Sequence, residues 1–167
     1  LPRKGSIMPD LLIELFSEEI PARLQAQAAD SLEKLVTTGM VNAGLTYTNA
    51  AAFHTPRRLT LAVAGLSETS PTFQEERKGP KLGAPEQAIQ GFLRGSGLKI
   101  EDLEIRDDKK GQAFFYTITR PSRPATEIIA DVLEAAIRNF PWPKSMRWGN
   151  GSLRWVRPLQ SILCLLS

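Results

Sequence analysis

The stretch LLIELFSEEIPARLQAQAADSLEKLV, residues 11–36, combines two different hydrophobic patterns. Residues 11–16 form a short apolar run with one acid, which is typical of a buried strand. Ser17 and the two glutamates after it predict a helix start, because a hydroxyl can cap the first amides and acids favour the positive end of the helix dipole. Between residues 21 and 42, apolar side chains recur at helical spacing and predict an amphipathic helix, the recurring residues being Leu24, Ala28, Leu32, Leu35 and Val36.

Two further strands follow this helix. Residues 47–54 suggest one, and residues 58–66 predict another because apolar and polar side chains alternate, with Thr55 and Pro56 breaking the chain between them. Strand, helix, strand and strand in this order begin a ferredoxin-like or related split β-α-β unit. We therefore expect an α+β fold with a mainly antiparallel sheet and helices packed on one face.

The remaining chain predicts a second α+β part. Residues 67–84 are rich in charge, proline and glycine and are interpreted as a linker or mobile loop. A short helix is expected at 85–93, closed by Gly95 and Gly97, then a hairpin formed by 103–105 and 113–119, and a second amphipathic helix at 124–140. We interpret residues 1–7 as a vector-derived leader, residues 8–66 as the first unit, and residues 85–167 as a second unit truncated at its C-terminal end.

The stretch FPWPKSMRWGNGSLRWVRP, residues 140–158, contains all three tryptophans and no acid. Prolines and glycines exclude a continuous helix here, and we expect a loop, a turn at 149–151 and a strand over 153–166. Arginine and tryptophan together favour RNA or a protein partner. Tryptophans that simply fill a core are an equally strong interpretation.

Composition sets further bounds. The net charge of +3 is a weak indication of nucleic acid, but the absence of acids at 35–67 and after Glu134 creates two basic regions that could share one face. The single cysteine, Cys164, excludes an internal disulfide and fits a reducing cytoplasm. No segment resembles a membrane span or a signal peptide.

Independent catalysis has little support. His54 is the only histidine, and Cys164 is expected to be buried in its strand. Asp107 and Asp108 lie in the expected hairpin turn without a third ligand at suitable spacing, so no metal site is predicted. The segment KGPKLG at 78–83 lacks the glycine spacing and the Lys-Ser/Thr ending of a phosphate-binding loop.

Several motifs together resemble the N-terminal part of the beta subunit of bacterial two-subunit glycyl-tRNA synthetase. They are LLIELFSEEIPA at 11–22, TPRRL at 55–59, KGP at 78–80, GF at 91–92, PWPKSMRWG at 141–149 and WVRP at 155–158. Phe16 and Ser17 depart from the Gly-Thr that the family more often carries, although Ser17 keeps the hydroxyl.

The resemblance implies a part of an α2β2 cytoplasmic ligase that joins glycine to its tRNA. It implies that ATP and magnesium act at the alpha subunit, with no cofactor and no catalytic residue in this chain, which alone would be inactive. The partners implied are the alpha subunit and glycine-specific tRNA.

We expect a set of basic residues, with one tryptophan as a stacking or packing element, to contact tRNA phosphates or a protein partner. The alternative is a protein-interaction scaffold that contacts the alpha subunit without touching RNA. The candidate residues are Arg57, Arg58, Lys144, Arg147, Trp148, Arg154 and Arg157.

Overall fold

The computed structural model describes residues 8–108 and 111–167, apart from the side chain of residue 108. The expected leader at 1–7 and the centre of the expected hairpin turn, residues 109 and 110, lie outside the described residues. The chain forms two compact units. Unit 1 joins the N-terminal part, up to Pro71, with Arg123–Ser167, and unit 2 is Thr72–Ser122.

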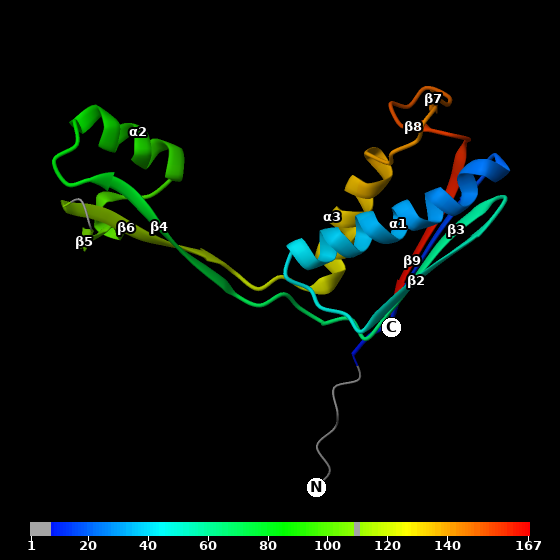
Figure 1. Ribbon diagram of the computed structural model, residues 1–167, viewed down its shortest axis with the longest axis horizontal. Coiled ribbons are helices and arrows are strands. Elements are labelled where there is room, and N and C mark those ends of the chain that lie inside the picture. The colour runs from blue at the N-terminus through cyan, green and yellow to red at the C-terminus, as the bar shows by residue number, and fades with distance from the viewer. Residues whose placement is uncertain (1–7, 109–110) are drawn as a thin grey trace, which may run out of the picture. The chain divides into compact units, whose positions relative to one another are not determined.

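Unit 1 contains a four-stranded antiparallel sheet (Figure 1). Its strands are β1 (Leu11–Ser17), β2 (Asn49–Thr55), β3 (Arg58–Ala64) and β9 (Leu159–Leu166), in the spatial order β2-β3-β1-β9. β3 lies between β1 and β2, which are joined by helix α1 (Ala22–Asn42), so these elements form a split β-α-β unit. The predicted fold class is therefore confirmed, including the ferredoxin-like arrangement of strands.

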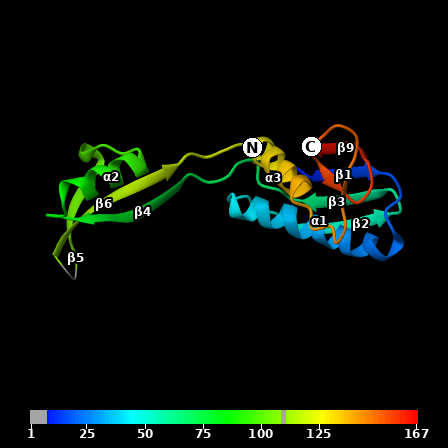
Figure 2. The ribbon, with the colours of Figure 1, turned by 90° about the horizontal axis from the view of Figure 1, so that it is seen from above.

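Two helices, α1 and α3 (Ala125–Arg138), lie on one face of this sheet (Figures 1 and 2). Alternate residues of β1 and β3 point toward them and are buried, because successive side chains in a strand face opposite ways. The helices contribute residues at helical spacing to the same core. Its largest fully buried members include Leu11, Ile13, Leu15, Leu32, Val36, Met40, Leu59, Leu61 and Ile128.

The start of α1 differs from the expectation. Its N-cap residue is Pro21, which makes no side-chain capping hydrogen bond, and the first turn contains no acid. Ser17 instead ends β1, where it is buried and its Oγ donates to the carbonyl of Glu18 over 2.9 Å. Four residues separate Ser17 from the helix, so its hydroxyl lies too far along the chain to cap the first turn.

Unit 2 is a three-stranded antiparallel sheet with one helix. Strands β4 (Phe73–Lys81), β6 (Gly111–Arg120) and β5 (Glu104–Asp108) lie in that order, and helix α2 (Glu86–Ser96) ends at Gly97, whose φ of 68° suits glycine. A single 3-10 turn, Ile100–Asp102, precedes β5. The predicted short helix and hairpin are thus confirmed, but with other bounds. The helix continues through Gly95 to Ser96, and Asp107 and Asp108, which were expected in the hairpin turn, belong to β5.

The interpretation of residues 67–84 as a linker or mobile loop is wrong for half of its length. Residues 73–81 form β4, which pairs with β6 at one edge of the sheet. Charged side chains are compatible with an exposed edge strand, and Pro80 falls where the register shifts between Lys78 and Lys81. Pro80 therefore lies outside the regular hydrogen-bonding pattern of the strand pair. The charged residues, Gly79 and Pro80 give this edge strand the composition of a loop.

The expected boundaries at 66 and 85 also differ from the observed units. Helix α3 and strand β9 complete the core of unit 1, whereas unit 2 is inserted between β3 and α3. The single strand expected over 153–166 is divided into β8 (Arg154–Trp155) and β9, with Arg157 and Pro158 between them. None of the helices in the described part of the chain is long and apolar enough to span a membrane.

Candidate nucleic-acid interface

Three segments that are distant in sequence meet at one end of the unit 1 sheet. The amide of Ser17 donates to the carbonyl of Arg57 over 2.9 Å, and the amide of Ile20 donates to that of Pro56 over 2.7 Å. The amide of Glu18 donates to the carbonyl of Pro158 over 3.0 Å. These backbone contacts fix the β1–α1 connection beside the β2–β3 turn and the start of β9.

Arg57 and Arg58 are exposed at this end, and both guanidinium groups lie over the ring of Phe16, at 5.1 and 4.8 Å from its centroid. Each also has a carboxylate partner. Arg57 Nη2 lies 3.2 Å from Glu18 Oε1, and Arg58 Nε lies 3.0 Å from Glu14 Oε1. Their positive charges are therefore partly compensated within the protein.

A two-stranded ribbon carries the next part of the site. Strand β7 (Met146–Arg147) pairs with β8, and the register places Arg147 directly opposite Arg154. Gly149, with φ of 65°, lies in the connection between the two strands, where a positive φ favours glycine. Both arginines are exposed, so the ribbon presents two like charges side by side.

Two cations of the stretch 144–157 donate to backbone oxygens and not to carboxylates. Arg154 Nη2 donates to the carbonyl of Ser145 over 2.8 Å, and Arg157 Nε donates to the carbonyl of Glu19 over 3.1 Å. Among the residues that the structure describes, no ion pair is formed by Lys144, Arg147, Arg154 or Arg157. We call these four residues the basic loop, and their charges have no carboxylate partner among the described residues.

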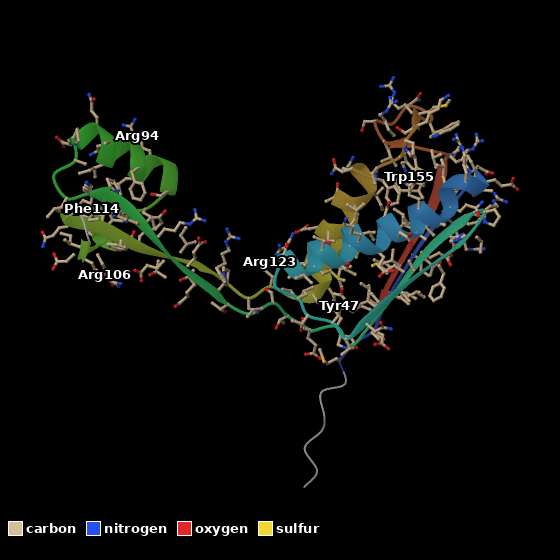
Figure 3. The ribbon with its side chains drawn as sticks, in the orientation of Figure 1. Tyr47, Arg94, Arg106, Phe114, Arg123 and Trp155 are labelled. Atoms are coloured by element: carbon tan, nitrogen blue, oxygen red, sulfur yellow. The ribbon has the colours of Figure 1, made fainter. Side chains whose placement is uncertain are left out.

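Tryptophans anchor the basic loop to the core of unit 1. Trp155 (labelled in Figure 3) is 1% exposed. Its ring centroid lies 4.9 Å from that of Phe140 and 5.0 Å from that of Trp142. Trp148 is half-buried, and its Nε1 donates to the carbonyl of Trp155 over 3.0 Å. The packing alternative for Trp148 thus has direct structural support, and Trp155 is unsuited to stacking on a base.

The six predicted basic residues therefore form two groups in unit 1, and the seventh predicted residue, Trp148, packs against the backbone of Trp155. Arg57 and Arg58 lie on Phe16 and form ion pairs, whereas the basic loop has only backbone partners or none that is described. Sequence reasoning missed Phe16 as the support, Glu14 as a partner, and Gln160, which donates to the carboxylate of Glu18. The alternation of β1 and β3 carried a signal for the first two, because residues on one face of paired strands become neighbours.

The groups considered for catalysis are not brought together. His54 is exposed near the end of β2, and Cys164 lies in β9. The expected burial of Cys164 is wrong, because β9 is an edge strand and the thiol remains exposed. Partial desolvation still raises the pKa of this thiol. Among the described residues, no group of three or more His, Cys, Asp or Glu side chains is arranged to hold a metal ion.

Comparisons with known proteins agree over nearly the whole chain. Residues 11–167 match the family described as "Glycyl-tRNA synthetase beta subunit". The chain is 70% identical over 160 residues to the "Glycine–tRNA ligase beta subunit" of Paracoccus denitrificans, and 64% identical over 159 residues to that of Dinoroseobacter shibae. These matches cover 96% and 95% of the chain.

The same matches cover 23% and 22% of the two relatives, so the chain spans less than a quarter of their length. It corresponds to the N-terminal part of these relatives. The family match and the coverage of this chain give the same assignment as the motifs in the sequence. The chain belongs to the glycyl-tRNA synthetase beta subunit family.

Proposed function

We propose that this chain helps a glycine–tRNA ligase to bind tRNA, through contact of the basic loop with the phosphate backbone. The observation that supports this most directly is the pairing of Arg147 with Arg154 across β7 and β8. Like charges directly opposite each other on a ribbon destabilise it, unless a counter-charge lies nearby. A phosphate between the two guanidinium groups supplies that charge and suits their planar donors.

The position of the basic loop also favours a large anionic partner. Its supporting aromatic residues are held in the core, so the strand ends and the turn at Gly149 are presented on a fixed base. Arg157 is fixed by the carbonyl of Glu19, at the sheet end that carries Arg57 and Arg58. Several cations held on a rigid support can contact successive phosphates without losing much conformational freedom on binding.

Within this proposal, Arg57 and Arg58 contribute less than the basic loop. Their carboxylate partners, Glu18 and Glu14, must be displaced or must share the guanidinium before a phosphate gains the full charge. Each pair is exposed, so its own contribution to stability is small. The two arginines therefore act as a secondary contact, with their stacking on Phe16 holding them in place.

The test uses the complete two-subunit enzyme. Binding of glycine-specific tRNA is measured over a salt series for the parent enzyme and for Arg147→Ala. One phosphate contact adds about one unit to the slope of log affinity against log salt, so the variant is expected to lose about one unit and to bind severalfold more weakly. In aminoacylation, KM for tRNA is expected to rise with kcat unchanged, because a uniform binding contact has been removed.

Arg58→Ala is the matched control, because Arg58 is exposed in the same unit but is paired with Glu14. Its salt slope is expected to change much less than that of Arg147→Ala. Equal slopes for the parent and Arg147→Ala would contradict direct RNA contact. If Arg147→Ala leaves tRNA binding unchanged and weakens association with the alpha subunit, the scaffold function replaces the proposed one.

The scaffold function remains the second candidate because of exposed apolar residues on the sheet of unit 1, among them Leu12 and Phe53. Such residues are common at protein contacts. In either case we propose that ATP and magnesium act at the alpha subunit, that the alpha subunit is a partner, and that this chain has no catalytic residue. Glycine-specific tRNA is a direct partner only if the basic loop contacts it. The single cysteine agrees with a cytoplasmic location.

A further inference from the structure

Strand β9 occupies the edge of the unit 1 sheet but has the sequence of an interior strand. It pairs with β1 on one side, and no strand of the described chain pairs with its other side. Residues 162–166, ILCLL, are all apolar. Continuous apolar runs are typical of strands covered on both faces, whereas half-exposed strands alternate apolar with polar residues.

The other edge strands of the protein behave differently. β4 of unit 2 carries several charged residues and Pro80, features that discourage pairing with a further strand. β2, at the opposite edge of the unit 1 sheet, contains three alanines and a single large apolar side chain, Phe53. β9 has no charge and no proline after Pro158, so none of these protections is present.

The helix side of β9 borders an apolar groove. Ile162 is 49% exposed there, although it faces the same side as the buried core. Together with Leu133 and Ile137 of α3 and with Leu153 and Leu159, it lines a groove of about 380 Å³. Helix α3 therefore covers this side of β9 incompletely.

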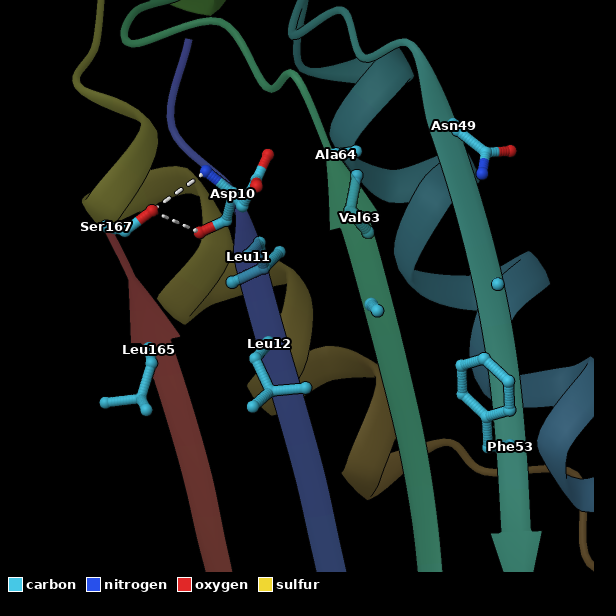
Figure 4. Close-up of a pocket in the computed structure, with 11 residues that line it drawn as sticks. Asp10, Leu11, Leu12, Asn49, Phe53, Val63, Ala64, Leu165 and Ser167 are labelled. Atoms are coloured by element: carbon cyan, nitrogen blue, oxygen red, sulfur yellow. Dashed lines mark hydrogen bonds between the residues drawn. The ribbon is translucent and has the colours of Figure 1, made fainter. Parts of the chain in front are cut away.

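The outer side of β9 is open as well. Leu165 is 54% exposed and lies opposite Leu12 of β1, on the face of the sheet away from the helices (Figure 4). The two residues border a shallow hollow of about 420 Å³ that extends across the sheet to Phe53 (Figure 4). Ser167 and Asp10 close one end of it, where the amide of Asp10 donates to Ser167 Oγ over 3.2 Å.

We propose that β9 is an interior strand of the complete beta subunit, and that the part of the same polypeptide following residue 167 covers its free edge and the α3–β9 groove. Two observations select this occupant. First, the unmatched part of the relative from Paracoccus denitrificans is more than three times as long as the part that this chain matches. Second, the matched part is the N-terminal one. The segment that follows residue 167 therefore starts at the end of β9, beside the outer hollow that Leu165 and Ser167 line, and the α3–β9 groove lies further back along the same strand, at Leu159 and Ile162.

Proximity along the chain favours this occupant over a separate molecule. A segment joined directly to β9 has a high effective concentration along this strand, so covering its edge and the α3–β9 groove loses less entropy than recruiting another chain. An added strand would form hydrogen bonds with the unpaired backbone edge of β9, and its side chains would contact the apolar residues on both faces of that strand. The inference is independent of tRNA binding by the basic loop.

Cys164 provides a probe inside β9, since it is exposed here and faces the helix side between Ile162 and Leu166. The complete beta subunit is treated with N-ethylmaleimide, and labelling of the Cys164 peptide is followed by mass spectrometry, with its rate in urea as reference. If the cover is present, labelling requires local opening and is expected to be at least about 100-fold slower than in urea. Asp30→Cys, an exposed position of α1, reports the rate of an uncovered helix residue.

Protection of Cys164 in the isolated subunit, independent of protein concentration, supports the proposal. A rate within about tenfold of that in urea overturns it, because an uncovered thiol needs no opening. Protection that grows with concentration indicates a second copy, and protection that needs the alpha subunit indicates that partner. Both of these results also overturn the assignment to the same polypeptide.

Two substitutions test the cover without using the thiol. Leu165→Thr and Val41→Thr remove apolar side chains that are equally exposed here, at 54% and 53%. In the complete subunit Leu165→Thr is expected to lower Tm by several degrees, because its side chain is then buried, and Val41→Thr is expected to leave Tm nearly unchanged. Equal, small shifts for both variants would contradict burial of β9.

Discussion

Units 1 and 2 both place helices on an antiparallel sheet, but they differ greatly in the core between the layers. The hydrophobic core cluster of buried residues belongs entirely to unit 1, where α1, α3 and the sheet all contribute. In unit 2 the buried apolar residues among those described are Ala113 and Tyr116, and α2 has none. Small units bury a small fraction of their surface, so we expect unit 2 to open far more readily than unit 1.

Aromatic residues also have different structural roles in the two units. In unit 1, Trp155 is enclosed by the core and supports the basic loop. In unit 2, Tyr116 meets Phe92 edge to face, with ring centroids 5.3 Å apart, and this contact holds α2 on its sheet. Figure 3 labels three other residues of this unit, of which Arg94 and Arg106 are exposed and Phe114 is half-buried. The same type of residue therefore supports a deep core in one unit and a thin one in the other.

The largest expected effect is that of Trp155→Ala. Removal of a fully buried indole is expected to lower the free energy of unfolding of unit 1 by about 3–5 kcal/mol, through lost burial and the cavity left behind. Urea unfolding followed by circular dichroism measures the change. Met146→Ala is the control, since Met146 lies opposite Trp155 in the ribbon but is exposed. A loss below about 1 kcal/mol for Trp155→Ala would contradict its role as the anchor.

Tyr116→Ala tests whether unit 2 opens independently. Loss of this ring is expected to remove roughly 2–3 kcal/mol, an effect comparable with the whole stability of so small a unit. Amide hydrogen exchange is then expected to accelerate across Thr72–Ser122 and to stay unchanged in unit 1. Phe73→Ala, at an exposed position, serves as the control. Faster exchange in both units would show that they unfold as one cooperative structure.

The elements of unit 1 were largely predictable because their patterns are local. Alternation in β3 and the four-residue spacing of Leu24, Ala28, Leu32 and Val36 directly reflect burial on one face. The boundaries of the units were not predictable in this way. Pairing of β1 with β9 joins residues about 150 positions apart, and β4 was missed because an exposed edge strand can have the composition of a loop.

The candidate site was predictable in residue type but not in pairing. The absence of acids after Glu134 indicated free cations, and the basic loop has no described ion pair. Arg57 and Arg58 also lie in an acid-free stretch, yet their partners come from β1 and the residue after it. Local sequence cannot reveal such partners, because sheet register decides which side chains become neighbours. The contact of any of these residues with tRNA stays a prediction.

The smallest expected effects, and the ones that distinguish the two units best, are those of substitutions at glycines inside their helices. A Cβ at Gly39 of α1 would lie 2.7 Å from Cγ1 of Val132 in α3, so Gly39 permits close approach of the two helices. Overpacking costs about 1–3 kcal/mol, whereas alanine gains about 1 kcal/mol of helix propensity. Gly39→Ala is therefore expected to destabilise unit 1 by about 1 kcal/mol, and Val132→Ala in the same chain is expected to relieve the clash.

Gly91 of α2 is the matched position in unit 2, because nothing lies within 4 Å of a Cβ placed there. Gly91→Ala is expected to stabilise unit 2 by about 0.5–1 kcal/mol, through the lower entropy of the unfolded chain and better helix propensity. Hydrogen exchange resolved by unit measures both variants on one scale. Opposite signs follow if only unit 1 is packed tightly enough to resist an added methyl group. The same sign at both positions would mean that helix propensity alone decides the effect of the added methyl group. The tighter packing inferred for unit 1 would then be contradicted.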